Sequence, residues 1–249
     1  MSEIPCDRAL DSTLALLRDG YEFISKGCER HQSDIFQTRL LLQPTLCLRG
    51  AEAARIFYDT EKFIRQGAAP KRIQKTLLGE GGVQGLDGAA HQHRKRMFMA
   101  LMSPERIEWL VELTHQQWRS QVRQWESEQT VVLLNAAQTV LCQAVCAWAA
   151  VPLAAAEVSL RTRDLAAMID GSGAIRPRHW RGRQGRQRSE EWLQQVIKKV
   201  RQQVLSPAAE SALFTIAWHR DLQGQLLDLK TAAVELLNVL RPTVAIARY

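Results

Sequence analysis

The sequence predicts a mainly α-helical fold with one small β-hairpin near the amino terminus. Apolar residues recur at helical spacing through most of the chain beyond residue 89, which is the pattern of helices that bury one face. Residues 35–42 and 45–48 are instead rich in strand-forming residues and flank Gln43-Pro44, which is typical of a hairpin. No second convincing hairpin follows. The sequence therefore places a small sheet first and helices after it.

The expected helices have recognisable start and stop signals. Ser103, Pro104 and Glu105 supply an N-cap, a first-turn proline and an early acidic residue. Pro152 ends the apolar segment that precedes it, because proline cannot continue a helix without losing a hydrogen bond. The expected helices span residues 12–24, 51–58, 89–101, 104–125, 131–151, 154–169, 189–204, 206–219 and 226–249.

Two glycine-rich stretches interrupt these helices. Residues 68–88 indicate a loop broken by a short turn at residues 72–78. A phosphate-binding loop at Gly79 lacks the Lys-Ser/Thr ending and a preceding strand, so a mobile loop over a ligand site is favoured. The second stretch, residues 171–188, is interpreted as an excursion within one domain.

Composition indicates a soluble globular chain, since 46% of the 249 residues are hydrophobic and 24% are charged. No segment approaches the roughly 18 uninterrupted apolar residues of a membrane span. The first residues do not show the pattern of a secretory signal, so the cytoplasm is the expected location. A net charge of +7 raises nucleic acid as a partner, but the excess is concentrated between Arg176 and Arg188, where a solvated basic loop is favoured.

Five cysteines, with no paired spacing, argue against a disulfide framework. Cys142 and Cys146 lie one helical turn apart, but no further ligands follow at the intervals of a metal site. Both are expected to be small core residues.

The last segment carries the most informative residues. From Thr231 onward it is apolar nearly all round, which predicts a helix buried at the centre of a domain. Arg241 places a charge among apolar neighbours, and Pro242 ends or kinks a helix. One interpretation is a helix that stops at Arg241, whose side chain caps the last carbonyls. The apolar residues beyond Pro242 favour a helix that continues, with the buried cation facing the carboxylate of an apolar ligand.

Two motifs resemble one family. LLNVLRPTVAIA is similar to the central long helix of the fatty-acid peroxygenases, a branch of the cytochrome P-450 superfamily. GGVQGLDGAAHQHRKRMFMALM is similar to the distal loop and haem-contacting helix of that family. The resemblance covers essentially the whole chain. It implies that residues 1–249 form a single partial cytochrome P-450 domain, the amino-terminal or distal half of that fold, ending in the central helix.

The resemblance also implies roles for individual residues. His91 and Lys95, which share one helical face, and Arg65 would contact the propionates of haem b; all three are otherwise solvated basic residues. Gln84 occupies the distal position that is glutamine in hydroxylating relatives and histidine in decarboxylating ones. Leu78 occupies a position that steers which substrate carbon reacts, and leucine there favours the carbon next to the carboxylate.

The implied activity is hydroxylation of fatty acids with hydrogen peroxide, most readily at the alpha carbon, with no redox partner. Arg241-Pro242 replaces the acid–alcohol pair of ordinary members of the superfamily. The substrate carboxylate, held by Arg241, would act as the general acid–base. Positioning by the same contact would decide which carbon is oxidised.

The family holds its haem iron through a cysteine thiolate located beyond the central helix. None of the five cysteines matches that position, and Glu52 and Arg55 match the family's Glu-x-x-Arg only by letters. The chain is therefore expected to be a fragment or degenerate copy that is inactive by itself. Two alternatives remain: a helical remnant that binds fatty acids without haem, and a basic helical module that binds nucleic acid.

Overall fold

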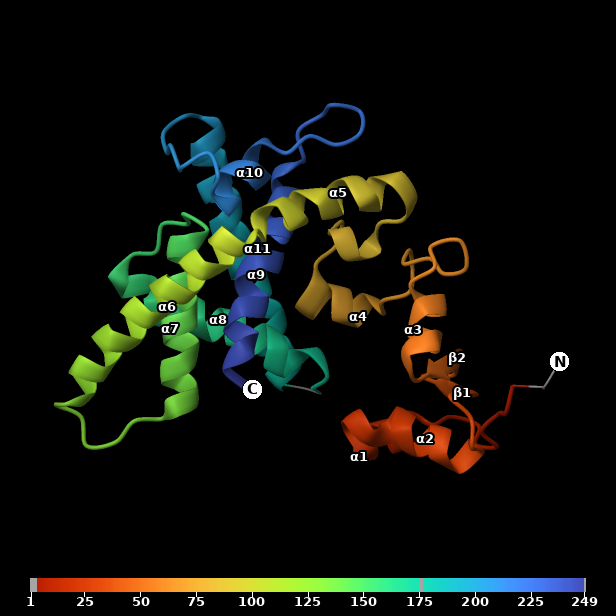
Figure 1. The fold of residues 1–249 in the computed structure, drawn as a ribbon. Coiled ribbons are helices and arrows are strands. Elements are labelled where there is room, and N and C mark those ends of the chain that lie inside the picture. The colour runs from red at the N-terminus through yellow and green to blue at the C-terminus, as the bar shows by residue number, and fades with distance from the viewer. Residues whose placement is uncertain (1–3, 175–176, 249) are drawn as a thin grey trace. The chain divides into compact units, whose positions relative to one another are not determined.

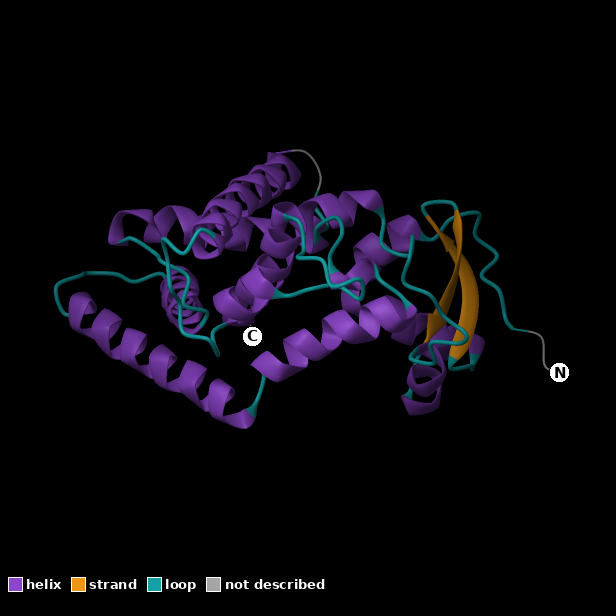
Figure 2. Cartoon of the chain, turned by 90° about the horizontal axis from the view of Figure 1, so that it is seen from above, coloured by secondary structure: helices purple, strands orange, loops and turns teal. Residues whose placement is uncertain are grey.

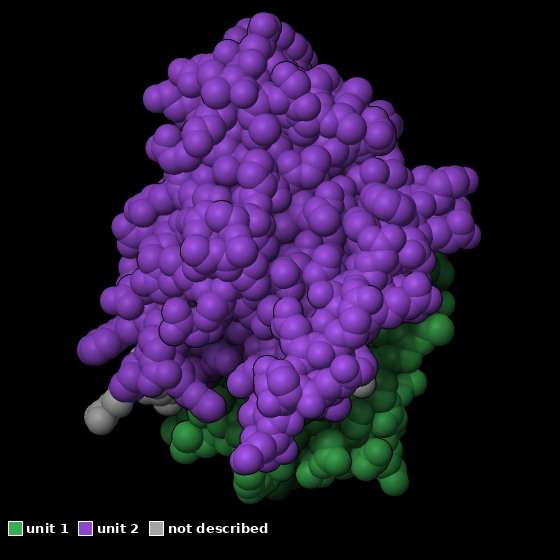
Figure 3. Space-filling view, turned by 90° about the vertical axis from the view of Figure 1, so that its left-hand side faces the viewer, with its two compact units in different colours: residues 1–64 green, residues 65–249 purple. Residues whose placement is uncertain are grey.

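The computed structural model describes residues 4–174 and 177–248 (Figure 1). The chain divides between Ile64 and Arg65 into two compact units, which Figure 3 distinguishes by colour. The expectation of one partial domain over residues 1–249 stays a prediction. Helices account for most of the second unit, and the described strands form one two-stranded sheet, in the first unit (Figure 2). The predicted fold class, mainly α with one hairpin, is confirmed.

The first unit contains the hairpin. Strands β1 (Ile35–Leu40) and β2 (Gln43–Leu48) pair antiparallel, with Thr38 opposite Thr45. The helices of this unit are α1 (Thr13–Asp19), α2 (Phe23–His31) and α3 (Ala51–Phe57). The expected helix over residues 12–24 is interrupted at Gly20, whose φ of 54° breaks the helical path.

The hairpin turn is not at Gln43-Pro44, as the sequence suggested, but at Leu41 and Leu42. Both leucines have positive φ, 51° and 62°, as a two-residue turn between twisted strands requires. Their amides donate to side chains at the start of α1: Leu41 N to Thr13 Oγ1 at 2.7 Å and Leu42 N to Asp11 Oδ2 at 2.5 Å. These long-range bonds stabilise a turn for which the leucines themselves give no local signal.

The second unit is a bundle of helices around α11. Its long helices are α5 (Gly88–Leu101), α6 (Pro104–Trp125), α7 (Leu133–Trp148), α8 (Val158–Ser172), α9 (Pro177–Arg201) and α11 (Leu229–Ala245), with the shorter α4 (Lys71–Ile73) and α10 (Ala212–Trp218). Every residue from Ala232 to Arg241 is buried, so the predicted central helix is confirmed. Asp228 caps α11 by accepting from Thr231 N at 2.9 Å. Among the helices described, none is long and apolar enough to cross a membrane.

The predicted basic loop between Arg176 and Arg188 is wrong over its described part, because residues from Pro177 onward belong to helix α9; Arg176 lies outside the described residues. Gly182 and Gly185 lie against α8, where an added Cβ would be 2.8 Å from Ala167 O and 2.9 Å from Asp164 O. These glycines permit close helix packing; they do not break the helix. Arg188 pairs with Asp164 at 2.5 Å, so part of the basic charge is neutralised.

The close crossing of α8 and α9 predicts a position-specific cost of a larger side chain. Gly182→Val would force the two backbones apart, and we expect it to lower the free energy of unfolding by about 2–3 kcal/mol more than Gln184→Val, an exposed change in the same helix. Chemical denaturation followed by circular dichroism measures both. Equal losses in the two variants would contradict close packing at Gly182.

Candidate functional site

Arg241 is a buried cation without an acidic partner. Its side chain is 7% exposed, its Nε has no hydrogen-bond partner, and it forms no ion pair with any described residue. Burial, reinforced by the nearby charge of Arg186, lowers the pKa of Arg241 to about 10. A buried guanidinium with an unused donor is costly, so the site is suited to an anion that enters from outside the fold.

Helix α11 continues through Pro242 to Ala245, and the interpretation that the helix stops at Arg241 is wrong. Because Pro242 has no amide hydrogen, the carbonyl of Asn238, four residues earlier, has no helical donor. The amide of Ile246 closes the helix by donating to Thr243 and Val244 carbonyls. The arginine therefore projects from within a helix and does not cap its end.

A glycine-rich loop lies against α11. It starts with a π-helical turn, η2 (Gln74–Leu78), and ends with a 3₁₀ turn, η3 (Val83–Gly85). Between them Gly79 has a φ of 88°, and an added Cβ there would be 2.5 Å from Val234 Cγ1 on α11. The glycines thus let the loop backbone approach the central helix closely.

A chain of hydrogen bonds joins this loop to α11 and α5. Asn238 Nδ2 lies 3.2 Å from Gln84 Oε1 and 3.3 Å from Glu235 Oε2. Glu235 Oε1 accepts from Arg94 Nη1 at 2.7 Å, in a buried ion pair. Burial raises the pKa of Glu235, although Arg94 and Asn238 act in the opposite direction. Gln84 is therefore held through Asn238 to a fixed pair of charges.

Three predicted site residues line one cavity of about 210 Å³. Arg65, Leu78 and Gln84 contribute to it, together with backbone of the glycine-rich loop. Arg241, His91 and Lys95 are not among the residues that line it. The structure thus brings the loop residues together and places the helical residues outside that cavity.

His91, Lys95 and Arg65 lie close enough together for their charges to interact. His91 is half-buried, and burial together with the charges of Arg65 and Lys95 lowers its pKa. Arg65 Nη1 lies 3.9 Å from Asp87 Oδ1, whereas Lys95 is exposed and has no ion pair with a described residue.

The charges of Arg65 and Lys95, with the imidazole of His91 as a hydrogen-bond donor, fit the propionate carboxylates of a haem. An iron ligand would be sought among the cysteines, because this family binds its haem iron through a thiolate. Of the cysteines, Cys6 is exposed in the first unit and the other four are buried, as predicted for Cys142 and Cys146. No cluster of metal-ligating side chains occurs in the part of the chain that the structure describes.

The sequence did not reveal the roles of Glu235, Asn238 and Arg94. Glu235 and Asn238 stand out as polar residues in an otherwise apolar helix. The sequence pattern does not reveal their partners, which are distant in the chain. Arg94 and Glu235, for example, are 141 positions apart.

No protein-family model matches this sequence. Among curated proteins, cytochrome P450 26A1 of Danio rerio is 22% identical over 125 residues, which are 50% of this chain and 25% of that protein.

Solved structures are more similar. Cytochrome P450SP alpha is 48% identical, with a TM-score of 0.94 over 96% of this chain and 59% of that chain. Cytochrome P450EX alpha with myristic acid is 46% identical, with a TM-score of 0.93 over 99% of this chain and 59% of that chain. A variant of cytochrome P450 OleT in complex with arachidonic acid is 31% identical, with a TM-score of 0.94 over 99% of this chain and 60% of that chain.

The chain thus spans about three fifths of the length of these structures and matches them over nearly all of its own length. The resemblance inferred from the two sequence motifs is confirmed. The chain belongs to the fatty-acid peroxygenase branch of the cytochrome P450 superfamily and forms the amino-terminal part of that fold.

Proposed function

We propose that this chain supplies the carboxylate-binding part of a haem-thiolate peroxygenase that hydroxylates fatty acids with hydrogen peroxide. The observation that carries the proposal is the buried guanidinium of Arg241, which has no acidic partner among the described residues. Charge-assisted, two-point hydrogen bonds to a carboxylate would supply that partner. The guanidinium therefore selects ligands with a carboxylate at one end.

The solved relatives are consistent with a carboxylate as the recognised group. Their names report myristic acid with cytochrome P450EX alpha, arachidonic acid with cytochrome P450 OleT, and (R)-ibuprofen with cytochrome P450SP alpha. These molecules differ in their apolar parts and share a carboxylic acid. A fatty acid is accordingly the substrate class that we propose for this chain.

The cofactor that we propose is haem b, with its propionates held by His91, Lys95 and Arg65. When bound, haem supplies the iron at which hydrogen peroxide is activated. Arg65 and Lys95 would offset the propionate charges, which would otherwise be costly to bring near apolar protein, and His91 would donate a hydrogen bond.

Proton transfer requires a group that is free to titrate near the reacting atoms. Glu235 is the carboxylate on α11, but Arg94 binds one of its oxygens and Asn238 lies against the other. Gln84 is an amide and does not titrate. We therefore assign the general acid–base role to the substrate carboxylate held at Arg241. Arg241 and Pro242 occupy the place of the acid–alcohol pair that performs this role in ordinary members of the superfamily.

Regiochemistry follows from how the substrate is held. A carboxylate fixed at Arg241 leaves the alpha carbon as the first oxidisable position along the tail, and Leu78 limits the space at the loop. We propose alpha hydroxylation, in which hydrogen peroxide converts a C–H bond to C–OH and releases water. A reaction driven by hydrogen peroxide needs no redox partner. We also propose a cytoplasmic location.

A fatty-acid-binding protein without haem is the second candidate, because the buried guanidinium of Arg241 could bind a carboxylate with or without haem. Nucleic-acid binding is less well supported. Within the basic segment Arg186 is buried and Arg188 is paired with Asp164, which reduces the positive charge exposed to a polyanion.

A chimera tests the proposed activity. The carboxyl-terminal part of cytochrome P450SP alpha that this chain does not cover would be joined after residue 249. We expect the haem-loaded chimera to convert myristic acid to 2-hydroxymyristic acid with hydrogen peroxide, and the same chimera with Arg241→Met to lose at least 100-fold in kcat/KM. Mass spectrometry of the product gives both rate and position. Equal rates in the two chimeras would contradict the role of Arg241, and myristate binding without haem uptake would favour the second candidate.

The unpaired charge also predicts opposite effects at two equally buried arginines. Arg241→Met removes a buried cation that has no partner and should raise the free energy of unfolding of the ligand-free chain by about 1 kcal/mol. Arg94→Met leaves Glu235 buried without its cation and should lower it by about 3 kcal/mol. Urea denaturation measures both changes. A loss of stability in both variants would show that Arg241 has a partner within the fold.

A further inference from the structure

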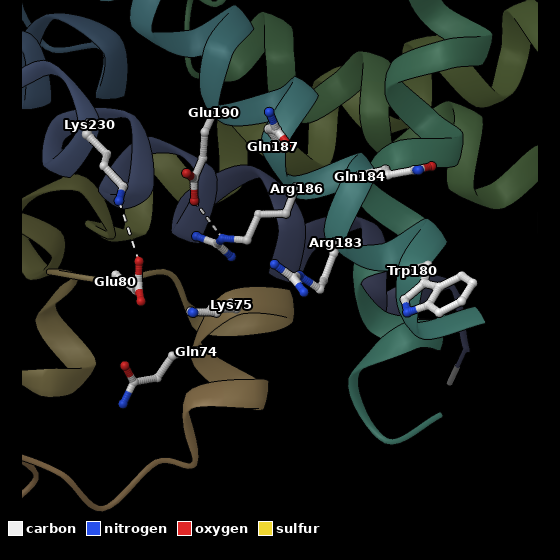
Figure 4. Close-up of a pocket in the computed structure, with 10 residues that line it drawn as sticks. All are labelled: Gln74, Lys75, Glu80, Trp180, Arg183, Gln184, Arg186, Gln187, Glu190 and Lys230. Carbon is white, nitrogen blue, oxygen red and sulfur yellow. Dashed lines mark hydrogen bonds and ion pairs between the residues drawn. The ribbon is translucent and has the colours of Figure 1, made fainter. Parts of the chain in front are cut away.

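A second buried arginine, Arg186 on α9, holds the glycine-rich loop. Its side chain is 3% exposed. Nε donates to Glu190 Oε1 at 2.6 Å, and Nη1 donates to the carbonyl of Leu77 at 2.6 Å. Figure 4 shows Arg186 directed from α9 toward the loop, with its bond to Glu190 drawn. A charged side chain therefore binds a main-chain oxygen of η2.

The bound carbonyl directly precedes Leu78, which lines the 210 Å³ cavity with Gln84. Because η2 is a single π-helical turn, its own hydrogen bonds hold it weakly. Residues of α9 supply the missing support at a second point, where Thr76 Oγ1 lies 3.3 Å from His179 Nδ1. The position of Leu78 thus depends on contacts with α9 as well as on the loop.

Gly79 shows how closely Arg186 approaches the loop. A Cβ added at this position would collide with Arg186 Nη2 and with Val234 of α11. Nη2 is buried and has no hydrogen-bond partner. Burial lowers the pKa of Arg186, even with Glu190 beside it, so the charge is kept there at some cost to stability. A role of the contact between Arg186 and Leu77 in shaping the 210 Å³ cavity would account for this cost.

We propose that Arg186 is a positioning residue that fixes Leu78 in the wall of the 210 Å³ cavity and thereby limits the space available to a ligand there. The identity of the ligand as a fatty acid rests on the proposed function. The holding of the loop by Arg186 does not depend on that identity, so an experiment can disprove either statement and leave the other intact.

Hydrogen exchange of the ligand-free chain tests the fixation. Gly79 N donates to Gln74 O at 2.7 Å, which makes the Gly79 amide a reporter of η2. We expect Arg186→Met to accelerate exchange at residues 77–79 on the order of 10-fold and to leave α5 unchanged. The matched control is Arg183→Met, which changes an exposed residue of the same helix. Arg183 and Arg186 both line a second cavity, of about 510 Å³ (Figure 4). Equal exchange in the two variants would overturn the proposal.

Ligand selectivity distinguishes a loss of the position of Leu78 from a general loosening of the fold. We expect the parent chain to bind myristate more tightly than 2-methylmyristate, because a branched acid needs more room and Leu78 narrows the 210 Å³ cavity. Arg186→Met should reduce this ratio several-fold, Arg186→Lys should restore part of it through one remaining donor, and Arg183→Met should leave it unchanged.

A ratio that stays at the parent value while exchange accelerates would overturn the specificity role. A failure of the parent chain to bind either acid would contradict the proposed function, and the exchange measurement would still decide whether Arg186 holds the loop.

Discussion

The central helix carries a buried positive charge that no described residue neutralises. Helix α11 is buried over ten successive residues, and Arg241 is the last of them. A core helix would be more stable with an apolar residue in this place. The arginine is therefore best explained by a ligand that completes the site, and a carboxylate with an apolar tail satisfies both the guanidinium and its surroundings.

The neighbouring polar residues are arranged so that this charge stays available. Glu235 is occupied by Arg94, Gln84 is tied to Asn238, and Arg186 is engaged by Glu190 and a loop carbonyl. Glu235, the carboxylate on the same helix, is thus already paired with another cation. The contacts of Gln84 and Arg186 also tie the glycine-rich loop to α11 and α9, which holds the residues that shape the cavity.

Sequence patterns predicted the elements whose signals are local. The buried central helix followed from its apolar residues, and Arg241 was notable because a charge within such a helix needs a reason. The part of helix α9 before residue 189 was missed because Gly182 and Gly185 suggest a break, although here they allow α8 to pack closely. The Arg94–Glu235 pair and the Arg186–Leu77 bond join positions more than 100 residues apart, and helical periodicity carries no information about such contacts.

The central claim is that Arg241 binds the carboxylate of an apolar ligand. Isothermal titration of this chain and of Arg241→Met, each with myristate and with 1-tetradecanol, tests it most directly. The account predicts that the variant binds myristate about 10- to 100-fold more weakly and binds the alcohol as well as the parent does, because only the carboxylate loses its charge-assisted bonds. Equal affinity for myristate in both chains, or an equal loss for both ligands, would contradict it.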